Sequence, residues 1–568
     1  MSPHRALTVP DVLHEVFQYF ATHPWLTTAG AEMVTSDSFD PGRTGEASEA
    51  GVKAKRMTLA HAARTCKAFA EPASRVLWGA QDGLGPIIAV LKNARISASE
   101  DCAYDWVRFE HIARRVRALY TKGNNSLSDG DDTLKLICAR YVDCAIFPNL
   151  RVLVHGKYQP LDGLLLRRLC ASPALLFVDT WERDATIGES LAIISDAHPG
   201  LAHLHMLHLT CLDEDGNRAF AKFNNLHTAK FRHIDNALFI HLATLPRLKM
   251  LSGAFTVSKP EMDTETAFPA LQELVVDDLD YENSGDVFFL AALPYISSPS
   301  LTLFSIRVVV HPGEDLLGYL EELCAAPLLA HLREFDLSIH IGSDRLYENQ
   351  EEPDEEDEED ETAESVDFAG VLCRLQDMRE LKAITVFVAS MVPEFSLQDR
   401  HLEAIAETWP ELVRLEIGYS FQDVGFTRWD GPQRISWPSL GAIVSLAERC
   451  RKLEAIDVEF ESVDARALEE LEARAAVCEA PQTALRQIIV GPGVTDFCKK
   501  LSLTDPARVA AALRKLFPNL EGGKLEVIGG DSEEGSDLIV RYRLWDPSDT
   551  ETDMFRLMKA LEDAHLDG

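Results

Sequence analysis

The chain carries a short pattern of leucines and other apolar residues that recurs along most of its length. Its clearest copy is Leu201-x-x-Leu204-x-x-Leu207-x-Leu209-x-x-Leu212. Partial copies with the spacing apolar-x-x-apolar-x-apolar begin at Leu226, Leu271, Leu332, Leu381, Leu412, Leu453 and Leu485, and a shorter one is Leu150-x-x-Leu153. Apolar residues at alternate positions are typical of a short β-strand with one buried face. We therefore predict one strand in each copy.

The segments between the copies have apolar residues every three or four positions, the spacing of amphipathic helices. They are Ile187–His198, Asp315–Ala326, Gln398–Thr408, Ser439–Arg451, Ala465–Cys478 and Ala507–Phe517. Strands and helices this short cannot bury their apolar faces alone, so successive pairs must stack on one another. The shorter steps match leucine-rich repeats of roughly 20–29 residues. The predicted fold is an irregular leucine-rich-repeat α/β solenoid over about residues 93–545; an ordinary α/β domain with chance spacing is the alternative.

Two segments lie outside the repeat pattern. Residues 351–361 contain ten aspartates and glutamates. Such a block of like charges repels itself and cannot bury apolar surface, which predicts a disordered acidic loop at about 347–365. The last residues, 546–568, are expected to form a C-terminal capping helix.

The N-terminal region, residues 1–92, has a different pattern. Apolar residues recur at helical steps after Pro10, which suits a first helical turn: Val12, Leu13, Val16, Phe17 and Phe20. Residues 21–57 are rich in Thr, Ser, Gly and Glu without any period, so we predict a disordered insertion. Helical spacing resumes at Leu59–Phe69, and a third short helix is expected at Glu71–Trp78. The region is predicted to form a small three-helix module.

Composition narrows the classes of function. The formal charge of −36 argues against general binding to nucleic acid or to anionic membranes. No apolar run reaches the roughly 18 residues that span a bilayer, and the N-terminus lacks the pattern of a secretory signal. The eleven cysteines include no CxxC pair, which predicts free thiols in a reducing compartment. We expect a cytoplasmic or nuclear protein.

The residues that bear chemistry form no recognisable catalytic set. Three histidines lie close together in the sequence: His203 and His205 are expected to precede a strand, and His208 to lie on its exposed side. No carboxylate or cysteine at ligand spacing completes a metal site. Motifs of hydrolases, metalloproteases and kinases are absent from the sequence. The sequence therefore predicts a protein that is not an enzyme and has no metal or cofactor.

The N-terminal module resembles the F-box family, in the form common in mushroom-type fungi. The resemblance rests on the opening step Val9-Pro10-Asp11-Val12-Leu13, on the step Cys66-Lys67-Ala68-Phe69, and on the closing pair Leu77-Trp78. The insertion between the two halves departs from the family, which has a short polar link there. Loop closure costs grow slowly with length, so a long insertion can be accommodated.

The resemblance implies a substrate receptor of a Skp–cullin–F-box ubiquitin ligase, in which the module docks on the Skp adaptor and through it on a cullin. The residues it implies for adaptor contact are Pro10, Val12, Leu13, Val16, Phe17, Phe20, Leu59, Cys66, Lys67, Phe69, Leu77 and Trp78. The competing interpretation is a leucine-rich-repeat scaffold whose N-terminal helices only cap the repeats.

A client protein would bind on the strand-lined face of the repeats. The variable positions expected on that face are His208, Lys230, Arg232, Glu416, Asp457 and Glu459. The last three are acidic, so we predict that the C-terminal half of the face binds a basic segment of a client. The identity of the client does not follow from the sequence.

Overall fold

The fold is that of a computed structural model. It describes residues 9–21, 49–92, 105–121, 132–155, 163–180, 187–206, 214–257, 267–278, 288–310, 316–329, 331–341, 368–390, 394–421, 434–458, 460, 463–478, 480–489 and 505–520. The predicted acidic loop and the predicted C-terminal capping helix lie outside these residues. The chain divides into two compact units: Met1–Leu271 with Tyr295–Ser298, and Gln272–Pro294 with Pro299–Gly568.

The first unit opens with three helices, as the sequence predicts. They are α1 (Pro10–Gln18), α3 (Glu49–Thr65) and α4 (Lys67–Gly79). Two boundaries differ from the prediction. Helix α3 begins at Glu49, inside the segment expected to be disordered, because Ala, Lys and Arg at 50–56 favour helix even without an apolar stripe. The second and third helices meet at Cys66, whose extended backbone ends one helix and begins the next.

A parallel sheet follows in the first unit. Its strands, in sequence order and in spatial order, are β1 (Ala80–Asp82), β2 (Ala118–Tyr120), β3 (Val152–His155), β4 (Phe177–Thr180), β5 (His203–Met206), β6 (Thr228–Ile234) and β7 (Met250–Phe255). Strand β1 pairs with β2, so the strand array begins at Ala80, ahead of the boundary at residue 93 expected from the sequence. That strand is only three residues long, too short to show a period.

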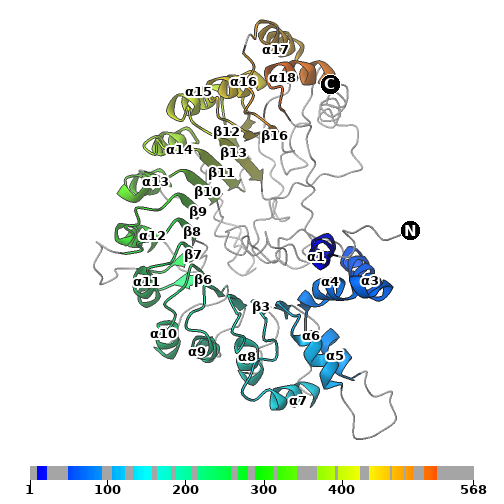
Figure 1. The fold of residues 1–568 in the computed structure, drawn as a ribbon. Coiled ribbons are helices and arrows are strands. Elements are labelled where there is room, and N and C mark those ends of the chain that lie inside the picture. Colours follow the sequence, from blue (N-terminus) through cyan, green and yellow to red (C-terminus); the bar gives the residue numbers. More distant parts are fainter. Residues whose placement is uncertain are drawn as a thin grey trace, which may run out of the picture. The chain divides into compact units, whose positions relative to one another are not determined.

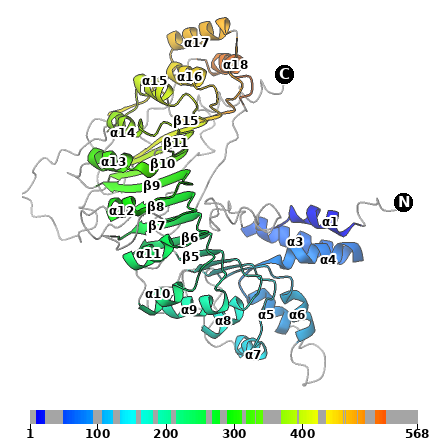
Figure 2. The same cartoon turned by 60° about the vertical axis from the view of Figure 1, so that its left-hand side comes forward.

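Helices lie on one face of these strands (Figures 1 and 2). They are α5 (Gly85–Lys92), α6 (Trp106–Ala113), α7 (Asp132–Arg140), α8 (Gly163–Cys170), α9 (Ile187–Ala197), α10 (Glu214–Phe220) and α11 (Asn236–Ala243). Each strand and the helix after it form one repeat. The strand face opposite the helices is called the open face below.

The second unit repeats the same strand–helix arrangement (Figure 1). Its parallel strands are β8 (Glu273–Asp278), β9 (Leu303–Val310), β10 (Glu334–Ile341), β11 (Ala383–Ser390), β13 (Arg414–Phe421), β15 (Ala455–Val458) and β16 (Gln487–Ile489). Its helices are α12 (Phe288–Ala292), α13 (Leu316–Cys324), α14 (Phe368–Leu375), α15 (Asp399–Thr408), α16 (Leu440–Arg449), α17 (Ala465–Val477) and α18 (Pro506–Leu516). A separate two-stranded sheet joins β12 (Glu394–Ser396) and β14 (Arg434–Ser436).

The leucine pattern builds the core of each unit. Residues in register on neighbouring strands form a helix-facing row that is 0–1% exposed in the first unit: Leu119, Leu153, Val178, Leu204, Ala229 and Leu251. The corresponding row of the second unit is 0–2% exposed: Leu274, Phe304, Phe335, Ile384, Leu415 and Ile456. The predicted repeat is thus confirmed, and each unit has a leucine-rich-repeat-like strand–helix array.

The predicted register of one repeat is wrong. His203 and His205 were expected ahead of a strand, but both lie within β5 and are buried. Leu204 lies opposite Ala229, which is the second apolar residue of the copy that begins at Leu226. Leu204 is therefore the second apolar residue of its own repeat, which begins at Leu201. The leucines at 201–212 fit two strand registers that differ by three residues, and the pairing of β5 with β6 selects the earlier register. His205, and not His208, therefore occupies the position equivalent to Lys230.

Candidate partner-docking surface

The N-terminal helices share a small apolar core. Leu13 and Phe17 of α1 are 2% and 7% exposed, and they pack with Leu59 of α3 and with Ala73 and Val76 of α4. The Phe17 ring meets the Phe69 ring edge-on, with 5.6 Å between centroids. These contacts hold the three helices together. Leu13, Phe17 and Leu59 are therefore packing residues of the module, and their contact with an adaptor stays a prediction.

A second apolar stripe along α1 faces outward. It consists of Val12 and Val16 of α1 and of the residues that cap its two ends, Val9 and Tyr19; in chain order the four are 38%, 43%, 47% and 86% exposed. Their steps of three, four and three residues place them along one side of the helix. An outward face of a helix is ordinarily polar. We call these four residues the α1 stripe.

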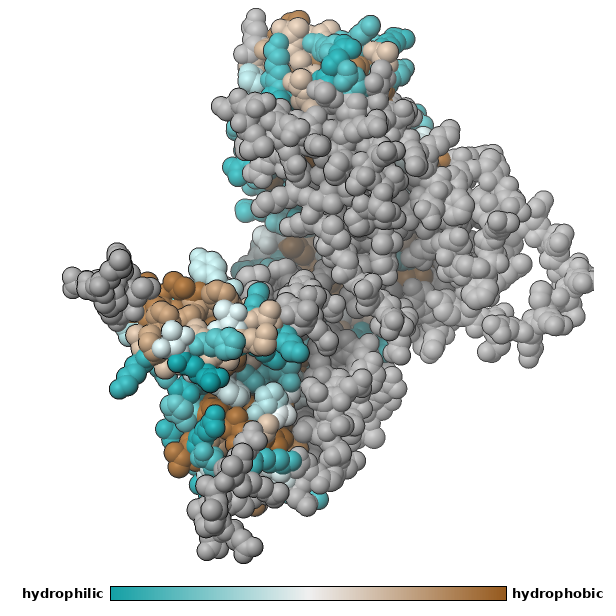
Figure 3. Space-filling view, turned by 90° about the vertical axis from the view of Figure 1, so that its right-hand side faces the viewer, coloured by the Kyte–Doolittle hydropathy of each residue, from teal (hydrophilic) through white to brown (hydrophobic). Residues whose placement is uncertain are grey.

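The other residues implied by the F-box resemblance divide by exposure. Pro10, Cys66 and Lys67 are exposed, and four are half-buried: Phe20, Phe69, Leu77 and Trp78. The structure shows three more exposed apolar residues on this module that the resemblance did not imply: Val9, Tyr19 and Met57. Met57 lies on α3 and is 51% exposed. Val9 and Tyr19 continue the spacing of Val12 and Val16, so the sequence held the signal for both. Figure 3 shows apolar side chains gathered on the surface of these helices.

Ion pairs attach the helices to the repeats that follow. Arg56 of α3 bonds Asp82 of β1 at 2.5 Å. Glu71 of α4 pairs with Arg75 at 3.1 Å and also with Arg115. Burial alone would raise the pKa of Glu71, but the hydrogen bonds from Arg115 and Arg75 outweigh it and lower the pKa. The helical module is thereby fixed to the first strands of its own unit.

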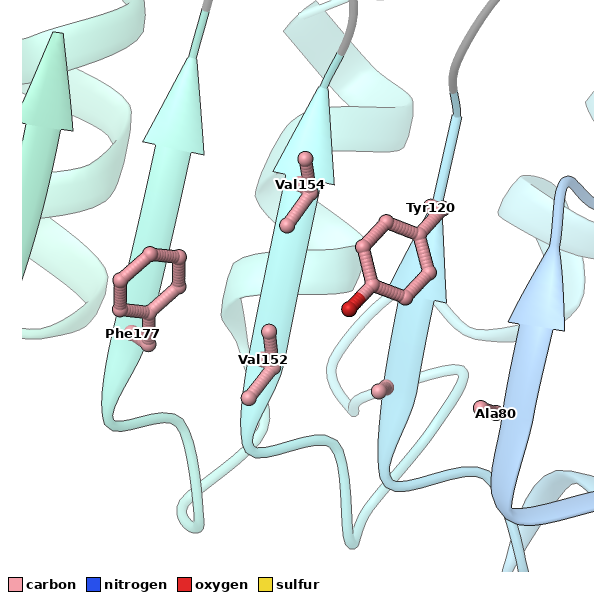
Figure 4. Packing of buried hydrophobic residues seen from close by; sticks show 6 residues of the cluster. Ala80, Tyr120, Val152, Val154 and Phe177 are labelled. Atoms are coloured by element: carbon pink, nitrogen blue, oxygen red, sulfur yellow. The ribbon is translucent and has the colours of Figure 1, made fainter. Parts of the chain in front are cut away.

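The open face of β1–β4 is apolar and buried. Figure 4 shows this cluster on the side of the strands away from the helices. Its members are 0–6% exposed: Ala80, Ala118, Tyr120, Val152, Val154 and Phe177. The other face of these strands packs on helices. Strands that are buried on both faces have continuous apolar sequences, because neither face meets water. This part of the open face is therefore covered.

The open face becomes polar at β5. His203 Nδ1 lies 2.8 Å from Thr228 Oγ1. The ring of His205 meets Phe177 edge-on at 4.6 Å. Burial lowers the pKa of His205 to about 3, helped by the charges of Lys230 and His203. Burial likewise lowers the pKa of His203 to about 4, so both imidazoles are neutral at neutral pH.

The structure locates four of the six residues predicted to bind a client. Lys230 is half-buried beside His205, and Arg232 is exposed where the register between β6 and β7 shifts. Glu416 and Asp457 are half-buried and directly opposite each other on β13 and β15. His208 and Glu459 lie outside the described residues. The first pair belongs to the first unit and the second pair to the second unit.

Other chemical features were searched within the described residues. No group of three or more His, Cys, Asp or Glu side chains there is arranged to hold a metal ion. The eight cysteines in that part of the chain are free thiols. No described helix has both the length and the apolar character needed to cross a membrane.

Comparisons with known proteins give little beyond this geometry. No protein-family model matches the chain, and no curated protein matches it. Among solved structures it is similar to an internalin from Listeria monocytogenes, with 12% sequence identity and a TM-score of 0.32. The similarity covers 66% of this chain and 80% of that chain. A similarity this weak carries no argument about function, and the repeat architecture rests on the strands and helices described above.

Proposed function

We propose that the chain is a protein-binding adaptor whose N-terminal helices dock on a Skp-type subunit of a ubiquitin ligase. The observation that carries the proposal is the α1 stripe. Four apolar side chains stay exposed on a helix whose other apolar residues fill the module's own core. A stripe of this kind on a small module marks a surface that a partner covers.

The repeats would supply the client-binding surface of the adaptor. A stacked strand–helix array presents a broad strand-lined face to a protein partner. We propose that the chain works without catalytic residues, metal or cofactor of its own, in the cytoplasm or the nucleus. A scaffold that binds proteins through its repeats, with helices that only cap them, is the competing function.

Co-purification with a Skp-type adaptor separates these two functions. The wild-type chain and two double variants would each be expressed with a tagged adaptor. V12E/V16E places two carboxylates in the α1 stripe. V107E/V142E makes the same change at two exposed valines outside it: Val107 lies on α6, and Val142 follows the end of α7. The adaptor should be recovered with the wild type and the V107E/V142E chain, and lost with V12E/V16E.

Two outcomes would refute docking by this module. Absence of the adaptor from the wild-type preparation would favour the scaffold. Equal recovery with V12E/V16E would show that another surface binds. L13E/F17E is a poor probe, because those side chains are buried and their replacement would separate the three helices.

A further inference from the structure

Three arginines form a local basic surface in a chain whose formal charge is −36. They are Arg75 on α4, Arg117 immediately before β2, and Arg151 immediately before β3. All three are exposed and belong to the first unit. We call these residues the arginine patch. The sequence pattern gave no reason to single them out.

The backbone holds two of the three arginines side by side. The Arg151 N–H donates to the Arg117 carbonyl at 2.7 Å, and the Arg117 N–H donates to the Gly79 carbonyl at 2.8 Å. These bonds extend the parallel ladder by one residue before the strands begin, and neighbouring strands in such a ladder lie about 4.8 Å apart. Gly79 ends α4, which carries the third arginine, Arg75. The patch is therefore built on the rigid junction between the helical module and the sheet.

The charges of the patch act on one another. Partial desolvation by the surrounding chain lowers the pKa of Arg117, although the residue as a whole is exposed, and the charges of Arg151 and Arg75 lower it further. His14 of α1 is affected by the same charges. Burial lowers the pKa of its imidazole most, and the charges of Arg117 and Arg75 lower it further. Arg117 thus lies within electrostatic range of both Arg151 and Arg75.

Two of the three arginines have no acidic partner in the described part of the chain. Arg75 shares Glu71 with Arg115, and no carboxylate among the described residues pairs with Arg117 or Arg151. Some exposed arginines elsewhere do have such partners. Arg218 bonds Asp215 at 2.7 Å, and Arg466 bonds Glu470 at 3.0 Å. Arg117 and Arg151 are adjacent in the ladder and both lack a carboxylate partner among the described residues, so two charges remain side by side for a ligand.

We propose that the arginine patch binds a short acidic segment of a protein partner. Guanidinium groups present paired donors that match carboxylates, and two adjacent ones can hold two acidic side chains. The formal charge of −36 argues against general binding of a polyphosphate chain, so an acidic peptide is the favoured ligand. The proposal does not depend on docking to a ubiquitin ligase.

The test is binding of a fluorescein-labelled hexaglutamate peptide to the full-length protein, followed by fluorescence anisotropy at low salt. R117E/R151E reverses the patch. R218E/R466E makes the same change in net charge at the exposed, paired arginines. R117Q/R151Q removes the charges without adding carboxylates, and circular dichroism checks that each variant folds. A labelled ten-residue oligouridylate tests nucleic acid as the ligand.

The wild type should bind the peptide, and binding should weaken as salt rises, because exposed charge pairs are screened. Both patch variants should bind at least about tenfold more weakly, while R218E/R466E stays within about twofold of the wild type. No binding by the wild type, or wild-type binding by R117Q/R151Q, would overturn the proposal. So would an equal loss in R218E/R466E, or tighter binding of the oligouridylate with the same dependence on the two arginines.

Discussion

Replacement of His205 by leucine should make the protein less sensitive to acid. His205 is 7% exposed, and its ring packs edge-on against Phe177 in the covered open face. Burial is the main reason that its pKa falls to about 3, and the charges of Lys230 and His203 add to it. Leucine keeps an apolar side chain in contact with Phe177 and removes the titrating group.

The sign and size of the effect follow from proton linkage. An imidazole in the unfolded chain has a pKa of about 6.5, so below that pH the unfolded chain binds a proton that folded His205 does not. Its contribution to stability is complete above about pH 6.5 and is lost as the pH falls toward 3. One such proton gives a slope of about 1.4 kcal/mol per pH unit in that window.

Urea unfolding followed by circular dichroism at about pH 7.5, 6 and 5 measures this slope. Between about pH 6 and pH 5, the wild type should lose about 1 kcal/mol more unfolding free energy than H205L. H331L is the control for replacing a histidine at the surface, because the His331 side chain is 80% exposed. If H205L and the wild type lost stability in parallel, His205 would not be buried and neutral in the folded protein.

Two further predictions concern a glycine and the acidic strand positions. A Cβ added at Gly253 would lie 2.6 Å from the Phe231 carbonyl oxygen, so G253A should cost roughly 1–3 kcal/mol of unfolding free energy in the same assay. G200A, with nothing within 4 Å of the added Cβ, is the control and should stay within about 0.5 kcal/mol of the wild type. E416K/D457K should weaken binding of a labelled hexalysine peptide by at least about fivefold if that face binds basic segments. The control is E403K/E448K, which reverses the charge of two exposed glutamates on α15 and α16. Equal losses of peptide binding in both double variants would refute a specific binding face.

The leucine spacing predicted most strands because each patterned side chain lies in the core. Strands β7 and β9 were not predicted, although Leu248-x-x-Leu251 and Leu301-x-x-Phe304-x-Ile306 have the same spacing. The strands β1 and β2 are three residues long, and a period cannot be read from so few positions. In β5 the sequence allowed two registers, and only the neighbouring strand decides between them.

The docking surface could be predicted only in part. The spacing of apolar residues on α1 predicts a helix, but it does not tell an inward side chain from an outward one when both sides are apolar. Leu13 and Val12 are neighbours in sequence, yet one is 2% and the other 43% exposed. The packing of α3 and α4 against α1 makes that distinction. The arginine patch likewise joins a residue of α4 with residues immediately before β2 and β3 that are far from it in the sequence.

The central claim, that the α1 stripe is a docking surface, is tested most directly by an equilibrium titration. A purified Skp-type adaptor would be titrated into the wild type, V12E/V16E and V107E/V142E. Val12 and Val16 are already about half buried, so covering each contributes roughly 0.7 kcal/mol to association. Losing both contributions should raise the Kd about tenfold, and the cost of burying two carboxylates in V12E/V16E should raise it further. V107E/V142E should leave the Kd unchanged. An unchanged Kd for V12E/V16E, or no saturable binding by the wild type, would contradict the claim.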